Sequence, residues 1–138
     1  MAKVLILGAG PAGVSASQYR ARGGVDTTVV TRGSGALEKA EKVQNYYGFA
    51  EPLSGAELER NGREGAKKVG VKFLQDEVTW LGMNDSFTGF LVKSAGQTYE
   101  ADSVILAAGA SRKAPNLPGL QELEGKGVSY CAICDAFF

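Results

Sequence analysis

The sequence contains no histidine, the side chain most often used as a metal ligand and as a general base near neutral pH. It contains only two cysteines, Cys131 and Cys134. A zinc site normally needs four ligands, so zinc could be held here only with carboxylates or across a dimer. We therefore predict no metal site.

Long apolar runs and an excess of one charge are also missing. The first apolar run, residues 4–7, ends at a glycine, whereas a membrane span needs about 18 apolar residues. The 15 basic residues balance the 15 acidic ones, and neither sign forms a long block. These absences argue against membrane and nucleic-acid partners. We expect a cytoplasmic protein, in a compartment that keeps thiols reduced.

Glycine, in contrast, is abundant, with 19 residues in a chain of 138. This is roughly twice the average usage, in a chain of the size of one ordinary domain. Glycines in such numbers mark tight turns and places where the backbone comes close to a ligand.

The first part of the chain has the pattern of a βαβ unit. Residues 3–7 (KVLIL) predict a buried parallel strand, residues 14–24 (VSASQYRARGG) a helix closed by two glycines, and residues 27–31 (TTVVT) a second strand. Residues 32–53 predict an irregular segment with a short helical turn.

A G-x-G-x-x-G motif, made by Gly8, Gly10 and Gly13, joins the first strand to the helix. In a dinucleotide site the first glycine permits the sharp turn, the second lets the backbone approach a pyrophosphate, and the third lets helix and strand pack closely. The helix N-terminus then offers N–H groups to the phosphates. The alternative is a glycine-rich structural turn without a ligand.

The acidic residue that this motif usually requires about 20 positions later, for a ribose hydroxyl, is missing. Thr31 and Arg32 stand at the end of the second strand, while Asp26 precedes that strand and Glu38 comes well after it. Arg32 could favour a 2′-phosphate, the ribose could be held differently, or Arg32 could be a solvated surface arginine.

Residues 54–70 predict an exposed helix. Ser54 is a suitable N-cap, and Glu57 stands three residues later at the capping-box spacing. Gly62 and Gly65 weaken this helix, by roughly 1 kcal/mol each relative to alanine.

Alternating segments follow. Residues 71–83, 87–94 and 97–101 predict three antiparallel strands, a β-meander. Residues 102–110 predict a further buried strand, and residues 128–131 the start of another.

Four stretches together resemble the low-molecular-weight thioredoxin reductases, in the expected order and over nearly the whole chain. They are GAGPAGVSASQYRARGG (8–24), GALEKAEKVQNYYGF (35–49), DSVILAAGASRKAPNLPG (102–119) and GVSYCAICDAFF (127–138). The resemblance implies an α/β fold: a Rossmann-like FAD-binding domain of the FAD/NAD(P)-binding superfamily, with a parallel sheet, helices and a three-stranded antiparallel β-meander. It divides the chain into residues 1–112, the first segment of that domain, and residues 113–138, a connector and the start of a second, pyridine-nucleotide-type domain.

The resemblance also implies a set of FAD-binding residues. They are Gly8, Gly10, Pro11, Ala12 and Gly13 at the pyrophosphate; Thr31 and Arg32 near the ribose; Gly35, Ala36, Leu37 and Asn45 toward the flavin; Val78 by the adenine; and Ala107, Ala108 and Gly109 closing over the cofactor.

The C-x-x-C pair, Cys131 and Cys134, resembles the redox centre of the family. The implied reaction passes electrons from flavin to the disulfide and on to a thioredoxin-like protein, with Asp135 as the general acid for the departing thiolate. The alternative from the residues alone is a pair of inert, half-buried cysteines.

Three substitutions depart from the family pattern: Ala108 for threonine, Ala136 for glycine and Tyr47 for proline. The tail SYCAICDAFF most resembles reductase-like flavoenzymes of anaerobic bacteria, some of which use ferredoxin. The resemblance thus implies NADPH or ferredoxin as donor and a homodimer at full length. The second glycine motif of full-length members is missing, so we expect an inactive fragment. The competing hypotheses are a non-catalytic Rossmann-like nucleotide-binding module and a structural domain completed by a partner chain.

Overall fold

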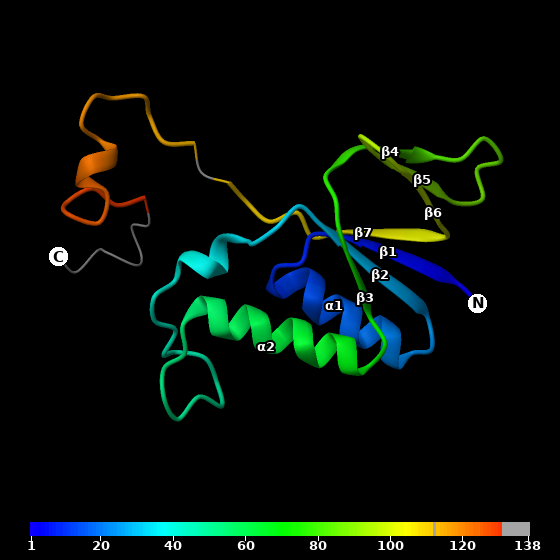
Figure 1. Ribbon diagram of the computed structural model, residues 1–138, viewed down its shortest axis with the longest axis horizontal. Coiled ribbons are helices and arrows are strands. Elements are labelled where there is room, and N and C mark those ends of the chain that lie inside the picture. The colour runs from blue at the N-terminus through cyan, green and yellow to red at the C-terminus, as the bar shows by residue number, and fades with distance from the viewer. Residues whose placement is uncertain (112, 131–138) are drawn as a thin grey trace.

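A computed structural model describes residues 1–111 and 113–130, and its centre is a parallel sheet of four strands in the order β3-β2-β1-β7 (Figure 1). Its strands are β1 (Lys3–Leu7), β2 (Asp26–Thr31), β3 (Lys72–Gln75) and β7 (Ser103–Leu106). Helices α1 (Pro11–Arg22) and α2 (Gly55–Lys68) pack together on one face. The predicted βαβ unit is present, and helix α1 begins at Pro11, inside the glycine motif, so that Gly13 lies in its first turn.

The central strand β1 is buried on both faces, as its continuous apolar sequence predicts. Val4 and Ile6 belong to the core under the helices, with Val14 of α1. Leu5 and Leu7, which point the other way, belong to a second core under the antiparallel strands. The sheet therefore separates two apolar layers, and the site at its edge rests on a rigid base.

The antiparallel sheet is the predicted β-meander, formed by β4 (Val78–Met83), β5 (Phe90–Ser94) and β6 (Thr98–Ala101). The prediction of a single strand over residues 71–83 is wrong. Its first part is β3, which pairs in parallel with β2, and only its second part enters the meander.

Two acidic residues, Asp76 and Glu77, separate these strands. The Asp76 N–H donates to the Thr31 carbonyl at 2.9 Å, and its carboxylate accepts a hydrogen bond from the Tyr99 hydroxyl of β6. Hydrogen bonds from Ser94 and then Tyr99 lower the pKa of Asp76. Asp76 thus ties the meander to the parallel sheet at the point where the chain changes sheets.

The prediction that residues 54–70 form a wholly exposed helix is also wrong. Ser54 and Glu57 do form the predicted capping box. One face of α2, however, is buried: Ala66 is fully covered, and a Cβ placed on Gly62 would lie 3.5 Å from the Val14 side chain of α1. The glycines that weaken α2 as an isolated helix let it lie close to α1.

The remaining elements are short. The 3₁₀ turns are η1 (Ala36–Lys39), the predicted helical turn, and η2 (Gln121–Leu123). The predicted strand from residue 128 is not found in its described part, where Val128 makes only an isolated bridge with Glu124. Within the described residues, no helix is long and apolar enough to cross a membrane.

Candidate functional site

The carboxyl ends of β1 and β7 meet the start of α1 at a crowded junction. Gly8 has φ +112°, and a Cβ placed on it would lie 2.1 Å from the Ala107 carbonyl oxygen. A Cβ on Gly13 would lie 1.9 Å from the Gly8 carbonyl oxygen. The Gly8 N–H donates to the Val30 carbonyl of β2 at 2.8 Å, and the Ala107 N–H donates to Leu7 at 2.9 Å. Only glycine fits at these two positions, so strands and helix approach to backbone contact.

Gly10 differs from both of these glycines. A Cβ placed on Gly10 would meet nothing within 4 Å, so the protein itself does not require glycine there. Gly10 is the N-cap of α1, and the Pro11 and Ala12 side of the first turn is exposed. No acidic residue stands in that first turn. The space above Gly10 thus faces free N–H groups at the positive end of a helix, an arrangement suited to a phosphate.

The end of β2 lies beside this junction. The Thr31 hydroxyl donates to the Gly33 carbonyl at 2.8 Å, which closes a tight turn after the strand. Arg32 points elsewhere: it pairs with Glu77 at 3.3 Å, and its side chain is 78% exposed. In the structure Arg32 is therefore a surface arginine with a surface partner.

The segment after this turn returns to the glycine motif. A Cβ on Gly35 would lie 3.9 Å from the Cα of Gly10. Leu37 packs by its carbonyl oxygen against Gly55, the first residue of α2, where a Cβ would lie only 1.7 Å away. Ala36 is exposed between them. Gly35 thus lies beside Gly10, and we call the turn Gly8–Gly13 together with Gly35 the candidate cradle at the edge of the sheet.

Of the other predicted cofactor residues, Ala108 lies beside the glycine motif, since a Cβ on Gly8 would lie 3.3 Å from the Ala108 Cα. Asn45 is exposed on a loop that a Val43–Leu53 bridge closes. Val78 starts β4 and packs on the core of the meander side. Ala108 and Gly109 are exposed after β7, where Gly109 has φ +71°.

Sequence reasoning missed one pair of charged residues next to the cradle. Arg63 of α2 donates from Nη2 to the Gly33 carbonyl at 3.2 Å and forms an ion pair with Glu59 of the same helix. The side chain of Glu59 is only 8% exposed. The signal in the sequence was the spacing of positions 55, 59, 62 and 66, which defines one helix face that contains three small residues.

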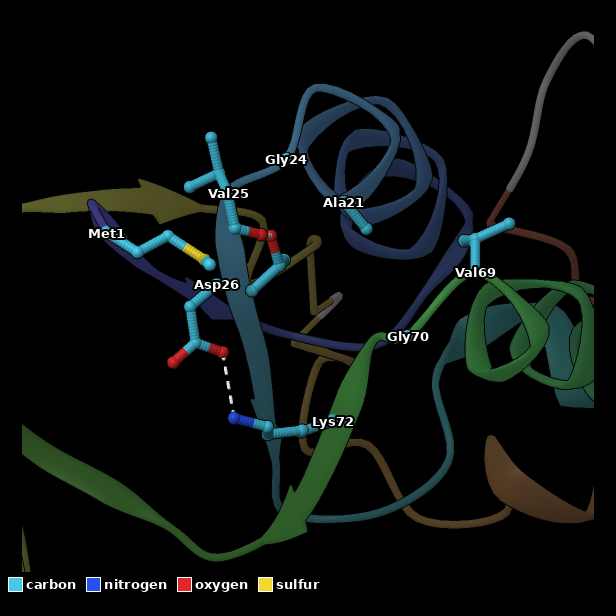
Figure 2. A pocket seen from close by; sticks show the side chains of 9 residues that line it. Met1, Ala21, Gly24, Val25, Asp26, Val69, Gly70 and Lys72 are labelled. Atoms are coloured by element: carbon cyan, nitrogen blue, oxygen red, sulfur yellow. Dashed lines mark hydrogen bonds and ion pairs between the residues drawn. The ribbon is translucent and has the colours of Figure 1, made fainter.

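A hollow at the opposite end of the parallel sheet is not a second candidate. Figure 2 shows it at the amino end of β2, between Met1, the end of α1 and the start of β3. Its charged groups, Asp26 and Lys72, already pair with each other at 2.9 Å. The Lys72 hydrogen bond lowers the pKa of Asp26. This end of the sheet presents no free helix N-terminus.

Comparison with known proteins agrees with the geometry. The sequence matches the family described as pyridine nucleotide-disulphide oxidoreductase over residues 2–138. It is 40% identical over 137 residues to the thioredoxin reductase of Bacillus subtilis (strain 168), covering 98% of this chain and 42% of that protein. The chain belongs to the pyridine nucleotide-disulphide oxidoreductase family.

Two further relatives describe the range of this family. A bifunctional thioredoxin reductase/thioredoxin of Mycobacterium leprae (strain TN) is 40% identical over 139 residues, covering 99% of this chain and 30% of that protein. The crystal structure of the atypical thioredoxin reductase TRi from Desulfovibrio vulgaris Hildenborough has 38% identity and a TM-score of 0.76, covering 100% of this chain and 46% of that one. This chain spans less than half the length of these relatives.

The family implies FAD and a pyridine nucleotide as cofactors in general. The residues of this chain fit a dinucleotide at the sheet edge, because the crowded Gly8–Gly13 junction holds α1 against the sheet while Gly10 leaves room for a phosphate. The predicted redox residues Cys131, Cys134 and Asp135 lie outside the described residues.

Proposed function

We propose that the protein carrying this chain is an FAD-dependent thiol-disulfide oxidoreductase of the thioredoxin reductase type. One observation carries the proposal: Gly10, unlike Gly8 and Gly13, is a glycine for which the protein has no steric need. A ligand that must approach the backbone supplies the reason. Of the two halves of FAD, the adenosine diphosphate half matches this position, at a helix N-terminus beside the end of β2.

Within this function, each part of the cradle has a binding role. The N–H groups of the first turn of α1, beside Pro11 and Ala12, bind the pyrophosphate. Thr31 and its turn lie near the ribose, and Val78 lies on the adenine side. The loop of Asn45 extends toward the isoalloxazine ring, and the segment Ala107–Gly109 closes over the cofactor.

We assign the dithiol chemistry to the C-x-x-C pair. Bound FAD supplies a carrier that accepts electrons from a donor and passes two of them on. Cys131 and Cys134 accept the two electrons as their S–S bond breaks, and Asp135 protonates one departing thiolate. The remaining thiolate attacks a disulfide of the acceptor protein, and the second cysteine resolves the mixed disulfide, which restores the starting pair.

The partners follow from the relatives. The acceptor is a thioredoxin-like protein, in keeping with the relative in which reductase and thioredoxin share one chain. The donor is NADPH or ferredoxin, and the family description, which names a pyridine nucleotide, supports the first. Ferredoxin is the alternative, because the tail SYCAICDAFF resembles reductase-like flavoenzymes of anaerobic bacteria, some of which use ferredoxin. We place the protein in the cytoplasm as a homodimer, with residues 1–112 in the FAD domain and residues 113–138 leading into the second.

Flavin content and one cysteine variant test the proposal. The whole protein should purify with visible flavin absorbance. Cys134→Ser should abolish thiol-disulfide turnover while the flavin absorbance stays unchanged. The reason is that Cys134 accepts electrons in the proposed reaction and has no part in binding the cofactor. A colourless protein that takes up no added FAD would refute the function. Tight FAD binding without any disulfide turnover in the native sequence would instead favour the nucleotide-binding module.

A further inference from the structure

The ion pair of Glu59 and Arg63 contains two polar atoms that the protein leaves unpaired. Glu59 is 8% exposed and Arg63 27%. Among the described residues, neither Oε2 of Glu59 nor Nε of Arg63 has a hydrogen-bond partner, although both atoms are buried. A buried ion pair costs desolvation free energy, and each unpaired atom adds to that cost. The ion pair thus contains one acceptor atom and one donor atom that have no hydrogen-bond partner among the described residues.

The pair lies at the candidate cradle. Helices α1 and α2 run side by side in the same direction, and both begin near the carboxyl ends of the parallel strands (Figure 1). Gly62 stands opposite Val14, and Gly65 stands opposite Gln18. Glu59, three residues before Gly62, is therefore level with the first turn of α1. Arg63 in turn binds the Gly33 carbonyl, two residues after the end of β2.

This is the position at which a dinucleotide presents its adenosine ribose. A ribose hydroxyl has one O–H donor and two acceptor lone pairs. It can donate to Oε2 of Glu59 and accept from Nε of Arg63, which would satisfy both atoms at once. We propose that Glu59 and Arg63 together recognise the adenosine ribose of the bound dinucleotide, and so replace the carboxylate missing from the end of β2. The inference rests on the proposed FAD site.

The charges also define what the pair rejects. Glu59 would repel a 2′-phosphate, and Arg63 is already neutralised by Glu59 and bound to Gly33. Arg32, the other cation at the end of β2, pairs with Glu77 on the surface. The site is accordingly selective for an unphosphorylated ribose, as in FAD or ADP.

The test measures binding of FAD and of two FAD analogues, whose adenosine lacks either the 2′- or the 3′-hydroxyl, to the apo form of the whole protein. The native protein should bind at least one analogue about tenfold more weakly than FAD, since a hydrogen bond to a charged group is lost. Glu59→Gln should weaken FAD binding and reduce that preference to about twofold. The exposed Glu64 of the same helix provides the matched control, and Glu64→Gln should change neither value.

Several outcomes would overturn the inference. Equal binding of FAD and both analogues by the native protein would do so without any variant. If Glu59→Gln lowers the affinity for FAD and for both analogues by the same factor, the preference for FAD is intact. Glu59 would then have a purely structural role. If that variant fails to fold, Glu59→Asp keeps the charge but withdraws the carboxylate, and the preference should still fall. A native whole protein that binds no FAD would refute the proposed function itself, and not only the role of Glu59 and Arg63.

Discussion

The two ends of the parallel sheet differ in a way that separates a binding site from a surface hollow. At the amino end, the hollow of Figure 2 is visible as a shape, but its charges Asp26 and Lys72 satisfy each other. At the carboxyl end, Gly10 is open and Glu59 keeps an unpaired oxygen. Incomplete hydrogen bonding next to a helix N-terminus indicates a ligand better than concavity does.

The largest effect should follow from crowding the carboxyl end. Gly13→Ala places a Cβ 1.9 Å from the Gly8 carbonyl oxygen, so α1 must move away from the sheet. We expect a loss of about 1–3 kcal/mol in the free energy of unfolding. Denaturant unfolding measures it. Gly96→Ala is the control, because a Cβ there meets nothing within 4 Å; an equal loss in both variants would contradict the packing argument.

Gly10→Ala should have the opposite profile. The new Cβ has room in the protein, and the free energy of unfolding should change by less than about 1 kcal/mol, the cost of a poorer N-cap. Affinity for FAD should fall by about tenfold or more, equal to ~1.4 kcal/mol, because the methyl group occupies the space of a phosphate. Titration of the apo protein with FAD measures this. Unchanged affinity would remove the main support for the site.

The smallest effect belongs to the amino end. Asp26 has a lowered pKa because Lys72 donates a hydrogen bond to it, so its contribution to stability exists at neutral pH. That contribution is lost as the pH falls through the lowered pKa, below the ordinary value of about 4. Asp26→Asn should slightly lower the thermal midpoint at pH 7 and leave it unchanged in strong acid, because exposed pairs contribute little. FAD affinity should not change; a clear loss would mean that the two ends are coupled.

Local patterns correctly predicted the strand, glycine turn and helix at the start of the chain, because the conformation or burial of these residues depends on local features of the sequence. Gly8 must adopt φ +112°, and the apolar run of β1 can only be buried. The four blocks of the resemblance predicted the family for the same reason.

Predictions failed where the outcome depends on distant parts of the chain. Apolar and polar residues alternate over residues 71–83 as in one strand. In the structure, however, the first half pairs with β2 and the second half with β5. Glu59 looked like part of a solvated helix, because the spacing of the small residues 55, 62 and 66 marks one helix face but does not show that α1 covers it. The position of Glu59 beside α1 depends on the packing of Gly62 against Val14, which the sequence of α2 alone does not show.

The partner strands of β1 also have a consequence for how the protein is made. β1 pairs with β2 soon after synthesis, but its other partner, β7, begins at residue 103, and the Lys3 N–H bonds the Asp102 side chain across 99 positions. Until that stretch leaves the ribosome, one edge of the most apolar strand has no partner. The close packing of Gly8 against Ala107 likewise forms only after residue 107 has been made. The edge of β1 that faces β7 therefore has to be shielded from self-association until residues 103–106 have been made.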